Sequence, residues 1–542
     1  MTQREKKGSV IFCFNAHLPF AKFIQSGEIF QERWFFEAML ESYLPTYQSF
    51  LDLAREKQSF SVLLSLSPTL ITLLQSEDLQ TKFVFYMHQK LLLARQEVER
   101  KAGSRDHVTA LYYATQIERM IHLYKALGGD ILKALKSAQK LGYCEVITSA
   151  ATMAFLPLFA TFEVAVEAQI ITAIRQYKDI FGSMPRGFFL PYGGYYPGLE
   201  NILERNGLKY FISAGQSLLQ GTPMASMGVF YPIRSQDSQM IAFPRHSVVD
   251  GELWAEGGFA LRDCYRNFYH EEAQSAIVIK AGFQEYSSFF SHDIIHLEGF
   301  KYASNADSGQ ASYILDEAFA QARADAQCFM QRRYEELENQ YAVHQKAGVT
   351  LMVIDLELLG HRWFEGIEFI QEAYRFIHNN TSVNVTVPQL FLKRSMHVPL
   401  EEIALHFASW GNFGYGQVWL DQHNDWLVRY TFKAIEQMID LANRFPAESG
   451  LKRRVLDQAA REVLLAMAGD WPLLIAQRVN EHVAVHQLKK HLHYFTEICD
   501  AMSCNALRAA WLTEMEREND IFKFKSFSYK IFCTTMNNKN RT

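Results

Sequence analysis

The sequence predicts an α/β protein, a closed barrel of parallel strands followed by an all-α C-terminal region. Short apolar runs alternate with longer amphipathic segments as far as Trp419, which is typical of a parallel sheet with helical crossovers. Beyond that residue only the helical pattern continues. With 542 residues, 49% hydrophobic and 21% charged, the chain has the composition of an ordinary globular protein with about three or four structural units.

Seven short apolar runs predict the strands of the barrel. Uninterrupted apolar runs of this length are expected of strands that are buried on both faces. The runs cover residues 10–14, 60–66, 145–148, 187–190, 210–213, 276–281 and 350–356. Amphipathic segments such as 30–56 and 77–101 predict helices between the strands. Seven strands favour a closed barrel over a small open sheet.

The alternating pattern breaks in one stretch, and it ends before the C-terminal region begins. Residues 215–272 are rich in Gly, Pro, Met and aromatic residues, which predicts a loop-rich inserted subdomain. Three helical segments follow Trp419, at 424–445, 450–468 and 480–502. The chain therefore divides into the first barrel segment (1–214), the inserted subdomain (215–272), the second barrel segment (273–418), a helical C-terminal domain (419–525) and a basic, solvated tail (526–542).

Charge and cysteine content exclude several classes of function. Lys and Arg total 54 against 59 Asp and Glu, a net charge of −5, which argues against partnership with nucleic acid or a membrane surface. The first fifteen residues predict no signal peptide, and no apolar stretch is long enough for a membrane span. Seven dispersed cysteines without a CxxC pair predict a cytoplasmic protein with no metal site and no cofactor.

Polar residues follow three of the predicted strands directly. The carboxyl ends of barrel strands share one face, where catalytic residues gather. The residues are Asn15 and His17 after the run 10–14, Tyr192 after 187–190, and Asp355, Glu357 and His361 after the run that begins at 350. We therefore expect them to meet at one mouth of the barrel. Esterase, NTPase and dehydrogenase motifs are absent from the sequence.

Five segments in order resemble the motifs of glycoside hydrolase family 57, and within that family most closely the 1,4-α-glucan branching enzymes. They read NAHLPF, GYCEVITSAATMAFLP, FFLPYGGYYPGLE, IDLELLGHRWFEG, and SWGNFGYGQVWL with NDW. The later segment QAAREVLLAMAGDWPLLI is similar to the helical domain of that subgroup. The resemblance implies a distorted (β/α)7 barrel, a small insertion, and a helical domain that closes the active site. It also implies an α-1,4-glucan such as glycogen or amylose as the partner.

The resemblance assigns roles to individual residues. Asp355 matches the acid/base of a retaining mechanism, and Tyr192 stands where the family has its nucleophilic Glu. Substrate binding is implied for His17, Glu145, Trp254, Glu357, His361, Trp410, Trp419 and Asp470. The chain departs from the family at three further positions, with Asn15 in place of a His, Met153 in place of a His and Arg362 in place of a Trp.

Each of these residue types also has a structural use. An Asp after a strand can cap a turn, and an Asp before a helix can cap that helix, so Asp355 and Asp470 have this alternative. His17 equally suits a buried, hydrogen-bonded histidine. Aromatic residues make up 14% of the chain, and their side chains can pack in a hydrophobic core as well as stack on a sugar ring.

The tyrosine at position 192 determines which functions the sequence predicts. A Glu is almost fully ionised at pH 7, whereas a Tyr with a pKa near 10 is ionised to about one molecule in a thousand, a deficit of roughly 4 kcal/mol. Sialidases use a Tyr nucleophile, and Glu145 or Glu357 is the candidate base here. The first hypothesis is thus a branching-type enzyme with an unorthodox nucleophile. The second is a non-catalytic glucan-binding or regulatory protein, and the third is a scaffold. The sequence makes no prediction of the oligomeric state.

Overall fold

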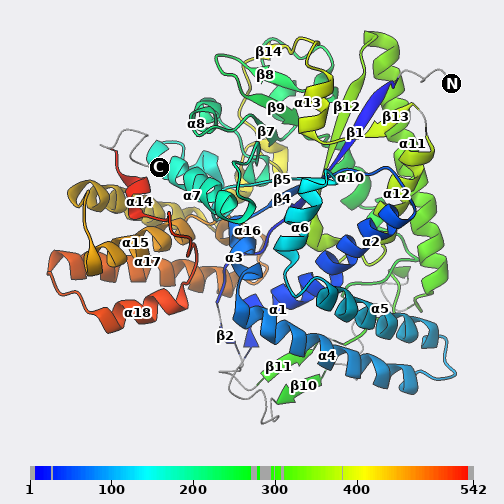
Figure 1. The fold of residues 1–542 in the computed structure, drawn as a ribbon, viewed down its shortest axis with the longest axis horizontal. Helices are drawn as coiled ribbons and strands as arrows, with labels where there is room; N and C mark the ends of the chain where they lie inside the picture. The colour runs from blue at the N-terminus through cyan, green and yellow to red at the C-terminus, as the bar shows by residue number, and fades with distance from the viewer. Residues whose placement is uncertain are drawn as a thin grey trace.

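The computed structural model describes residues 6–22, 24–25, 28–269, 277–280, 294–297, 299–306, 311–380 and 382–534. A barrel of seven strands lies at the centre of the molecule (Figure 1). The strands are β1 (Gly8–Ala16), β4 (Val62–Leu66), β5 (Cys144–Ile147), β6 (Gly187–Phe189), β7 (Tyr210–Ser213), β9 (Ile241–Pro244) and β12 (Gly348–Asp355). They have between three and nine residues, and nearly every side chain in them is buried.

Parallel strands of two sheets close into the barrel. One sheet has the order β12-β1-β4-β5, and the other contains β9-β7-β6. A single parallel bridge between Thr148 and Phe188 joins β5 to β6, and another between Arg245 and Leu351 joins β9 to β12. Because two of the seven pairs of neighbouring strands are joined by a single β-bridge each, the barrel is irregular. The predicted fold class, a distorted (β/α)7 barrel with a helical C-terminal domain, is confirmed.

Helices cover the outside of the barrel. They are α1 (Phe30–Glu37), the π-helical turn η1 (Ala38–Tyr43), α2 (Leu44–Arg55), α3 (Pro68–Leu74), α4 (Glu77–Arg100), α5 (His107–Ala126), α6 (Ile131–Lys140), α7 (Glu163–Phe181), α8 (Leu199–Arg205), α11 (Leu315–His344), α12 (Gly366–Asn379) and α13 (Pro388–Arg394). Two apolar cores result. Side chains such as Ile11, Leu63 and Val353 fill the interior of the barrel, and a larger core lies between the strands and the helices.

One of the seven predicted strands does not belong to the barrel. Ile277–Lys280, in the run predicted at 276–281, forms β10, which pairs antiparallel with β11 (Ile294–Leu297) in a separate two-stranded sheet. Residues 276 and 281 lie outside the described residues. The run is a genuine strand, but its apolar pattern cannot say which sheet it joins. The other six predicted runs match barrel strands to within two residues at each end.

The seventh barrel strand comes from the stretch predicted as a loop-rich insertion. Within 215–272 the chain forms α9 (Gln216–Leu219), β8 (Ile233–Ser235), β9 and α10 (Val248–Trp254). β9 pairs parallel with β7, and β8 joins β9 to the short strand β14 (Glu402–Ile403). The prediction that this whole stretch stands apart from the barrel is therefore wrong. The strand escapes notice because it has only four residues among polar loops.

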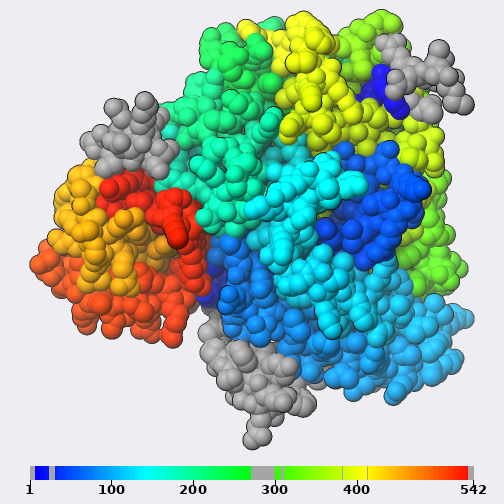
Figure 2. Space-filling view, in the orientation of Figure 1, coloured from blue at the N-terminus to red at the C-terminus, as the bar shows by residue number. Residues whose placement is uncertain are grey.

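The C-terminal region is helical, as predicted. It contains α14 (Asp425–Arg444), α15 (Gly450–Ala466), α16 (Asp470–Gln477), α17 (Glu481–Ser503) and α18 (Ala509–Glu518). In Figure 2 these helices form a lobe, orange to red, against the barrel. None of the helices in the described residues combines the length and the apolar character that a membrane crossing requires.

The predicted solvated tail at 526–542 is wrong in its first half. Tyr529, Ile531, Phe532 and Cys533 are at most 1% exposed. The turn η10 (Tyr529–Phe532) packs against α7 and α15, and the Tyr529 hydroxyl donates to the Phe445 carbonyl at 2.5 Å. Lysines and aromatic residues alternate here, and the aromatic side chains point inward. Lys539 and Arg541 lie outside the described residues.

Candidate functional site

A cavity of about 450 Å³ opens where the carboxyl ends of the barrel strands face the helical lobe. Its wall combines residues that are far apart in the sequence, from Asn15 near the carboxyl end of β1 to Asn480 between α16 and α17. Six of the ten predicted site residues line it, namely His17, Tyr192, Asp355, Glu357, Trp410 and Asp470. Of the six residues expected to meet at one mouth of the barrel because they follow predicted strands, all but His361 line this cavity.

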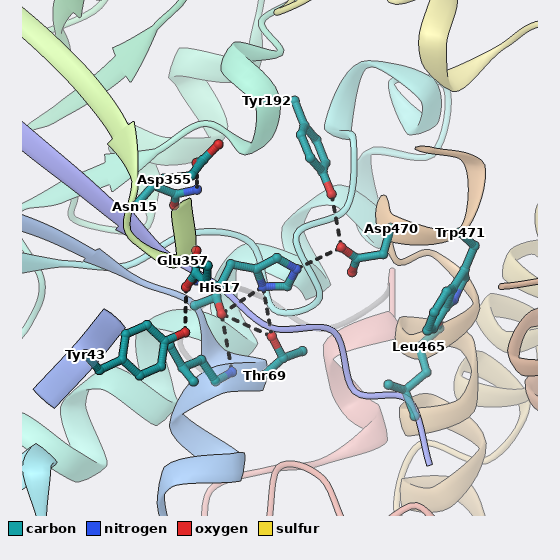
Figure 3. Close-up of polar contacts among 12 residues, drawn as sticks. Asn15, His17, Tyr43, Thr69, Tyr192, Asp355, Glu357, Leu465, Asp470 and Trp471 are labelled. Carbon is teal, nitrogen blue, oxygen red and sulfur yellow. Dashed lines mark hydrogen bonds and ion pairs between the residues drawn. The ribbon is translucent and has the colours of Figure 1, made fainter. Parts of the chain in front are cut away.

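Asp355 ends β12 and presents an exposed carboxylate to the cavity. Its neighbour across the β1–β12 pair is Asn15, because the parallel register places these two residues side by side. The Asn15 side-chain amide donates to Asp355 Oδ1 at 2.8 Å (Figure 3). The carboxylate is thus oriented by an uncharged donor and remains open to a ligand.

Glu357 lies two residues further on, in the 3-10 turn that follows β12. Its Oε1 accepts the backbone N–H of His17 at 2.8 Å and the Tyr43 hydroxyl at 2.5 Å. Burial raises the pKa of Glu357 to about 7, and the nearby Asp355 carboxylate adds to the shift. At neutral pH this carboxyl group is therefore divided between its acid and its ionised form.

His17 and Asp470 connect the barrel to the helical lobe. The Nε2 of His17 lies 2.9 Å from Asp470 Oδ1, and its Nδ1 lies 2.9 Å from the Ser67 hydroxyl. Burial lowers the pKa of His17, but the Asp470 carboxylate outweighs that effect, and the pKa stands above its usual value. The second oxygen of Asp470 is buried and has no hydrogen-bond partner among the described residues.

Tyr192 points its hydroxyl group toward the same carboxylate (Figure 3). It donates to Asp470 Oδ1 at 3.3 Å. Burial raises the pKa of Tyr192 well above 10, and Asp470 and Asp355 raise it further. The phenol is therefore neutral and serves as a hydrogen-bond donor.

The Tyr192 ring occupies a restricted space. The residue has a φ of 56°, a left-handed conformation that non-glycine residues rarely adopt. Its ring packs on Trp419, with 4.6 Å between ring centroids. A Cβ at Gly469 would lie 2.5 Å from Tyr192 Cε2 and 2.4 Å from the Met153 carbonyl oxygen. Glycine at 469, just before α16, is thus what allows the helical lobe to approach Tyr192.

Four predicted site residues do not line the cavity. Glu145 lies near the amino end of β5, at the opposite end of the barrel, where it accepts the Tyr210 hydroxyl at 2.7 Å. His361 turns to Glu41, with 2.9 Å between Nδ1 and Oε2. Trp254 packs edge-on against Trp363, and Trp419 is fully buried beneath Tyr192.

The four residues lie outside the cavity for the same physical reason. Membership of a motif says nothing about the end of the strand at which a side chain lies, or whether it points to the cavity or to the core. Glu145 is the second residue of β5 and so faces away from the mouth. It also lies outside hydrogen-bonding reach of Tyr192, which removes it as the candidate base.

Among the residues of the cavity region that were not predicted, two take part in polar contacts at the site. Tyr43 comes from the π-helical turn η1, which has no recognisable sequence pattern. Arg245 follows β9, lines the cavity and pairs with Asp250. Recognising 241–244 as a strand would have identified Arg245, since it occupies the position after the strand. Among the described residues no group of three or more His, Cys, Asp or Glu side chains could hold a metal ion.

Comparisons with known proteins agree with this geometry. Residues 11–274 match the family described as glycosyl hydrolase family 57, and residues 430–532 match the C-terminal region of 1,4-α-glucan branching enzymes. The chain is 26% identical to a 1,4-α-glucan branching enzyme of Thermococcus kodakarensis, over 95% of this chain and 78% of that protein. It is 22% identical to a probable 1,4-α-glucan branching enzyme of Mycobacterium tuberculosis, over 87% of this chain and 88% of that protein.

Two solved structures resemble the whole molecule. The α-amylase AmyC of Thermotoga maritima has a TM-score of 0.86 at 26% identity, covering 98% of this chain and all of that one. A family 57 branching enzyme of Pyrococcus horikoshii has a TM-score of 0.87 at 25% identity, covering 98% and 97%. The two matched regions, the seven-stranded barrel and the carboxylate-lined cavity agree with one another, and together they show that the chain is similar to the branching enzymes of glycoside hydrolase family 57.

Proposed function

We propose that the protein recognises α-1,4-glucans, the substrate class of the branching enzymes it is similar to, with the cavity as the glucan-binding site. The observation that carries this proposal is the grouping of Asp355, Glu357, His17 and Asp470 with the exposed ring of Trp410 around one cavity. Carboxylates and imidazole suit sugar hydroxyl groups, and an aromatic face suits the C–H face of a sugar ring.

Transfer of a glucosyl unit with retention requires two carboxyl groups about 5 Å apart, one of which forms a covalent intermediate. Asp355 is suited to the acid/base role, because its carboxylate is open to the cavity. The nucleophile position holds the Tyr192 phenol, whose raised pKa makes ionisation cost more than the ~4 kcal/mol of a free tyrosine at neutral pH. Between a branching enzyme and a non-catalytic glucan-binding protein, we therefore favour the second, which binds glucan without covalent turnover.

One observation favours the competing form, branching with a tyrosine nucleophile. The Tyr192 hydroxyl donates to a carboxylate, Asp470, which could receive its proton. A sialidase-like tyrosine needs such a base. In that mechanism Tyr192 oxygen bonds to the anomeric carbon while the phenolic proton passes to Asp470, and Asp355 protonates the departing sugar oxygen.

Incubation of the purified protein with amylose separates the two forms. We expect binding of amylose, measured by retardation in an affinity gel, and no new α-1,6 linkages in the recovered glucan. Branch formation that disappears in Tyr192→Phe would establish the tyrosine mechanism instead. Failure to retard the protein with any α-glucan would remove the proposed function altogether.

We also propose a cytoplasmic location, the compartment in which free thiols persist. Six cysteines are free thiols in the structure, namely Cys13, Cys144, Cys264, Cys328, Cys499 and Cys504. The mature protein isolated from its source should react with a thiol reagent at these six positions after unfolding.

A further inference from the structure

A loop beside the cavity carries three aromatic residues that are exposed to solvent. The loop spans residues 409–416, and Trp410, Phe413 and Tyr415 are 39%, 86% and 52% exposed. Trp410 also lines the cavity. The loop therefore shares Trp410 with the wall of the proposed glucan site.

Internal hydrogen bonds hold the loop in one shape. The Ser409 N–H donates to the Gly414 carbonyl at 2.9 Å, and the Gly414 N–H donates to the Gly411 carbonyl at 2.8 Å. The Ser409 hydroxyl accepts the Gly416 N–H at 2.7 Å. The Trp410 N–H donates to the Tyr192 carbonyl at 2.6 Å, which fixes the loop to the floor of the cavity.

The backbone at Phe413 is strained. Gly411, Gly414 and Gly416 have left-handed φ values of 76°, 80° and 74°, which glycine adopts without cost. Phe413 has a φ of 59°, in the same region, where a bulky side chain is a genuine outlier. The ring gains little burial in return, because it is the most exposed large apolar side chain among the described residues. Strained residues of this kind cluster at active sites and ligand-binding sites.

We propose that Phe413 and Tyr415 form a stacking platform for the glucan chain where it leaves the cavity, so that the protein prefers long chains. This inference rests on the proposed function and names the chain length that the site selects. Continuity identifies the occupant, because Trp410 belongs both to the cavity wall and to the loop. Flat, rigid aromatic rings offer contact area at a small cost in side-chain entropy.

Dissociation constants for maltotriose and maltoheptaose test the proposal on the full chain. Phe413→Ala should weaken the binding of maltoheptaose about tenfold, which corresponds to ~1.4 kcal/mol, and leave that of maltotriose unchanged. Phe413→Tyr keeps the ring and should retain the affinity. Phe413→Gly removes the ring and suits the left-handed backbone, so it should lose the same affinity while folding normally.

Leu420→Ala is the matched control, since Leu420 is 53% exposed just beyond the loop. It should change neither dissociation constant. Equal losses for both sugars in Phe413→Ala, or no loss for either, would refute the platform. So would a dimer of the wild type that dissociates in Phe413→Ala while sugar binding stays the same. If the wild type binds neither sugar, the proposed function itself is refuted. If the wild type binds both sugars with the same affinity, only the platform is refuted.

Discussion

Tyr192 is the single side chain on which the chemistry of the site depends. Its phenol is neutral and donates a hydrogen bond to the Asp470 carboxylate, and we propose that it occupies the position of a nucleophilic carboxylate. Tyr192→Glu should therefore form branches from amylose at about ten or more times the background level seen with the inactive wild type, because an ionised carboxylate needs no costly deprotonation before attack.

Tyr192→Gln, of equal size but without charge, is the control and should stay at the wild-type level. The measured quantity is the number of chain ends released by a debranching enzyme after incubation with amylose. Equal rates for the Glu and Gln variants would mean that Met153 or Gly193 no longer seats the sugar for attack.

Glu357 makes stability depend on pH. Its pKa of about 7 in the folded protein exceeds the ordinary value of 4.5, so the folded chain binds more protons than the unfolded chain between these limits. Stability is therefore lost as the pH rises from about 4.5 to 7, by up to about 3 kcal/mol.

Glu357→Gln keeps an oxygen for His17 and Tyr43 but cannot ionise. Relative to the wild type, this variant should gain stability between pH 5 and pH 8, measured as the difference in thermal unfolding midpoint at each pH. Parallel midpoints at the two pH values would contradict the assignment.

At the scale of the element, the approach of α16 to the barrel depends on Gly469. A Cβ there would collide with the Met153 carbonyl oxygen and the Tyr192 ring. Gly469→Ala should therefore destabilise the protein by about 1–3 kcal/mol and weaken glucan binding, because the lobe that carries Asp470 must shift.

Gly251→Ala in α10 is the matched control, since a Cβ there has no neighbour within 4 Å. It should leave glucan binding unchanged and hold or raise the midpoint of urea unfolding. Unaltered glucan affinity in Gly469→Ala would show that the lobe tolerates displacement.

The elements differ in how far the sequence predicts them. The runs 10–14 and 210–213 are continuous apolar stretches and appear as β1 and β7. The segment 77–101 appears as α4 within one residue, where Ser76 caps the helix and accepts the Leu79 N–H. β9 escapes prediction because four residues among polar loops carry no period, and β10 is assigned to the wrong sheet because pairing partners are a tertiary property.

The residues of the candidate site also differ in how far the sequence predicts them. His17, Tyr192 and Asp355 could be predicted because they follow strands, and the barrel brings the ends of strands together. Asp470 lies on a helix of another domain, so only its motif pointed to the site. Tyr43 reaches Glu357 from a π-helical turn, a contact that depends on packing and leaves no local pattern.

At the scale of the whole molecule, one ligand is expected to stabilise both domains. The cavity wall contains Asp355 at the end of β12 and Asp470 and Leu474 in α16. Maltoheptaose at a hundred times its dissociation constant should add about 2.7 kcal/mol to stability. Amide hydrogen exchange should therefore slow by about a hundredfold at the most protected positions of both α16 and β1.

Mass spectrometry of peptic fragments measures this exchange for the two elements separately. Protection confined to β1 would place the sugar in the barrel alone and contradict a shared site. Asp470→Asn, which leaves His17 without an anionic partner, should reduce the protection in both elements.

The pairing of His17 with Asp470 joins positions 453 residues apart in the chain. During synthesis the ribosome releases the first of these early and the second only after most of the polypeptide has emerged. A nascent chain thus has no complete sugar pocket to offer, however well its barrel has formed. The proposed polysaccharide site is completed late in synthesis, when the helical lobe forms. Truncated translation products that lack the lobe should therefore not bind starch.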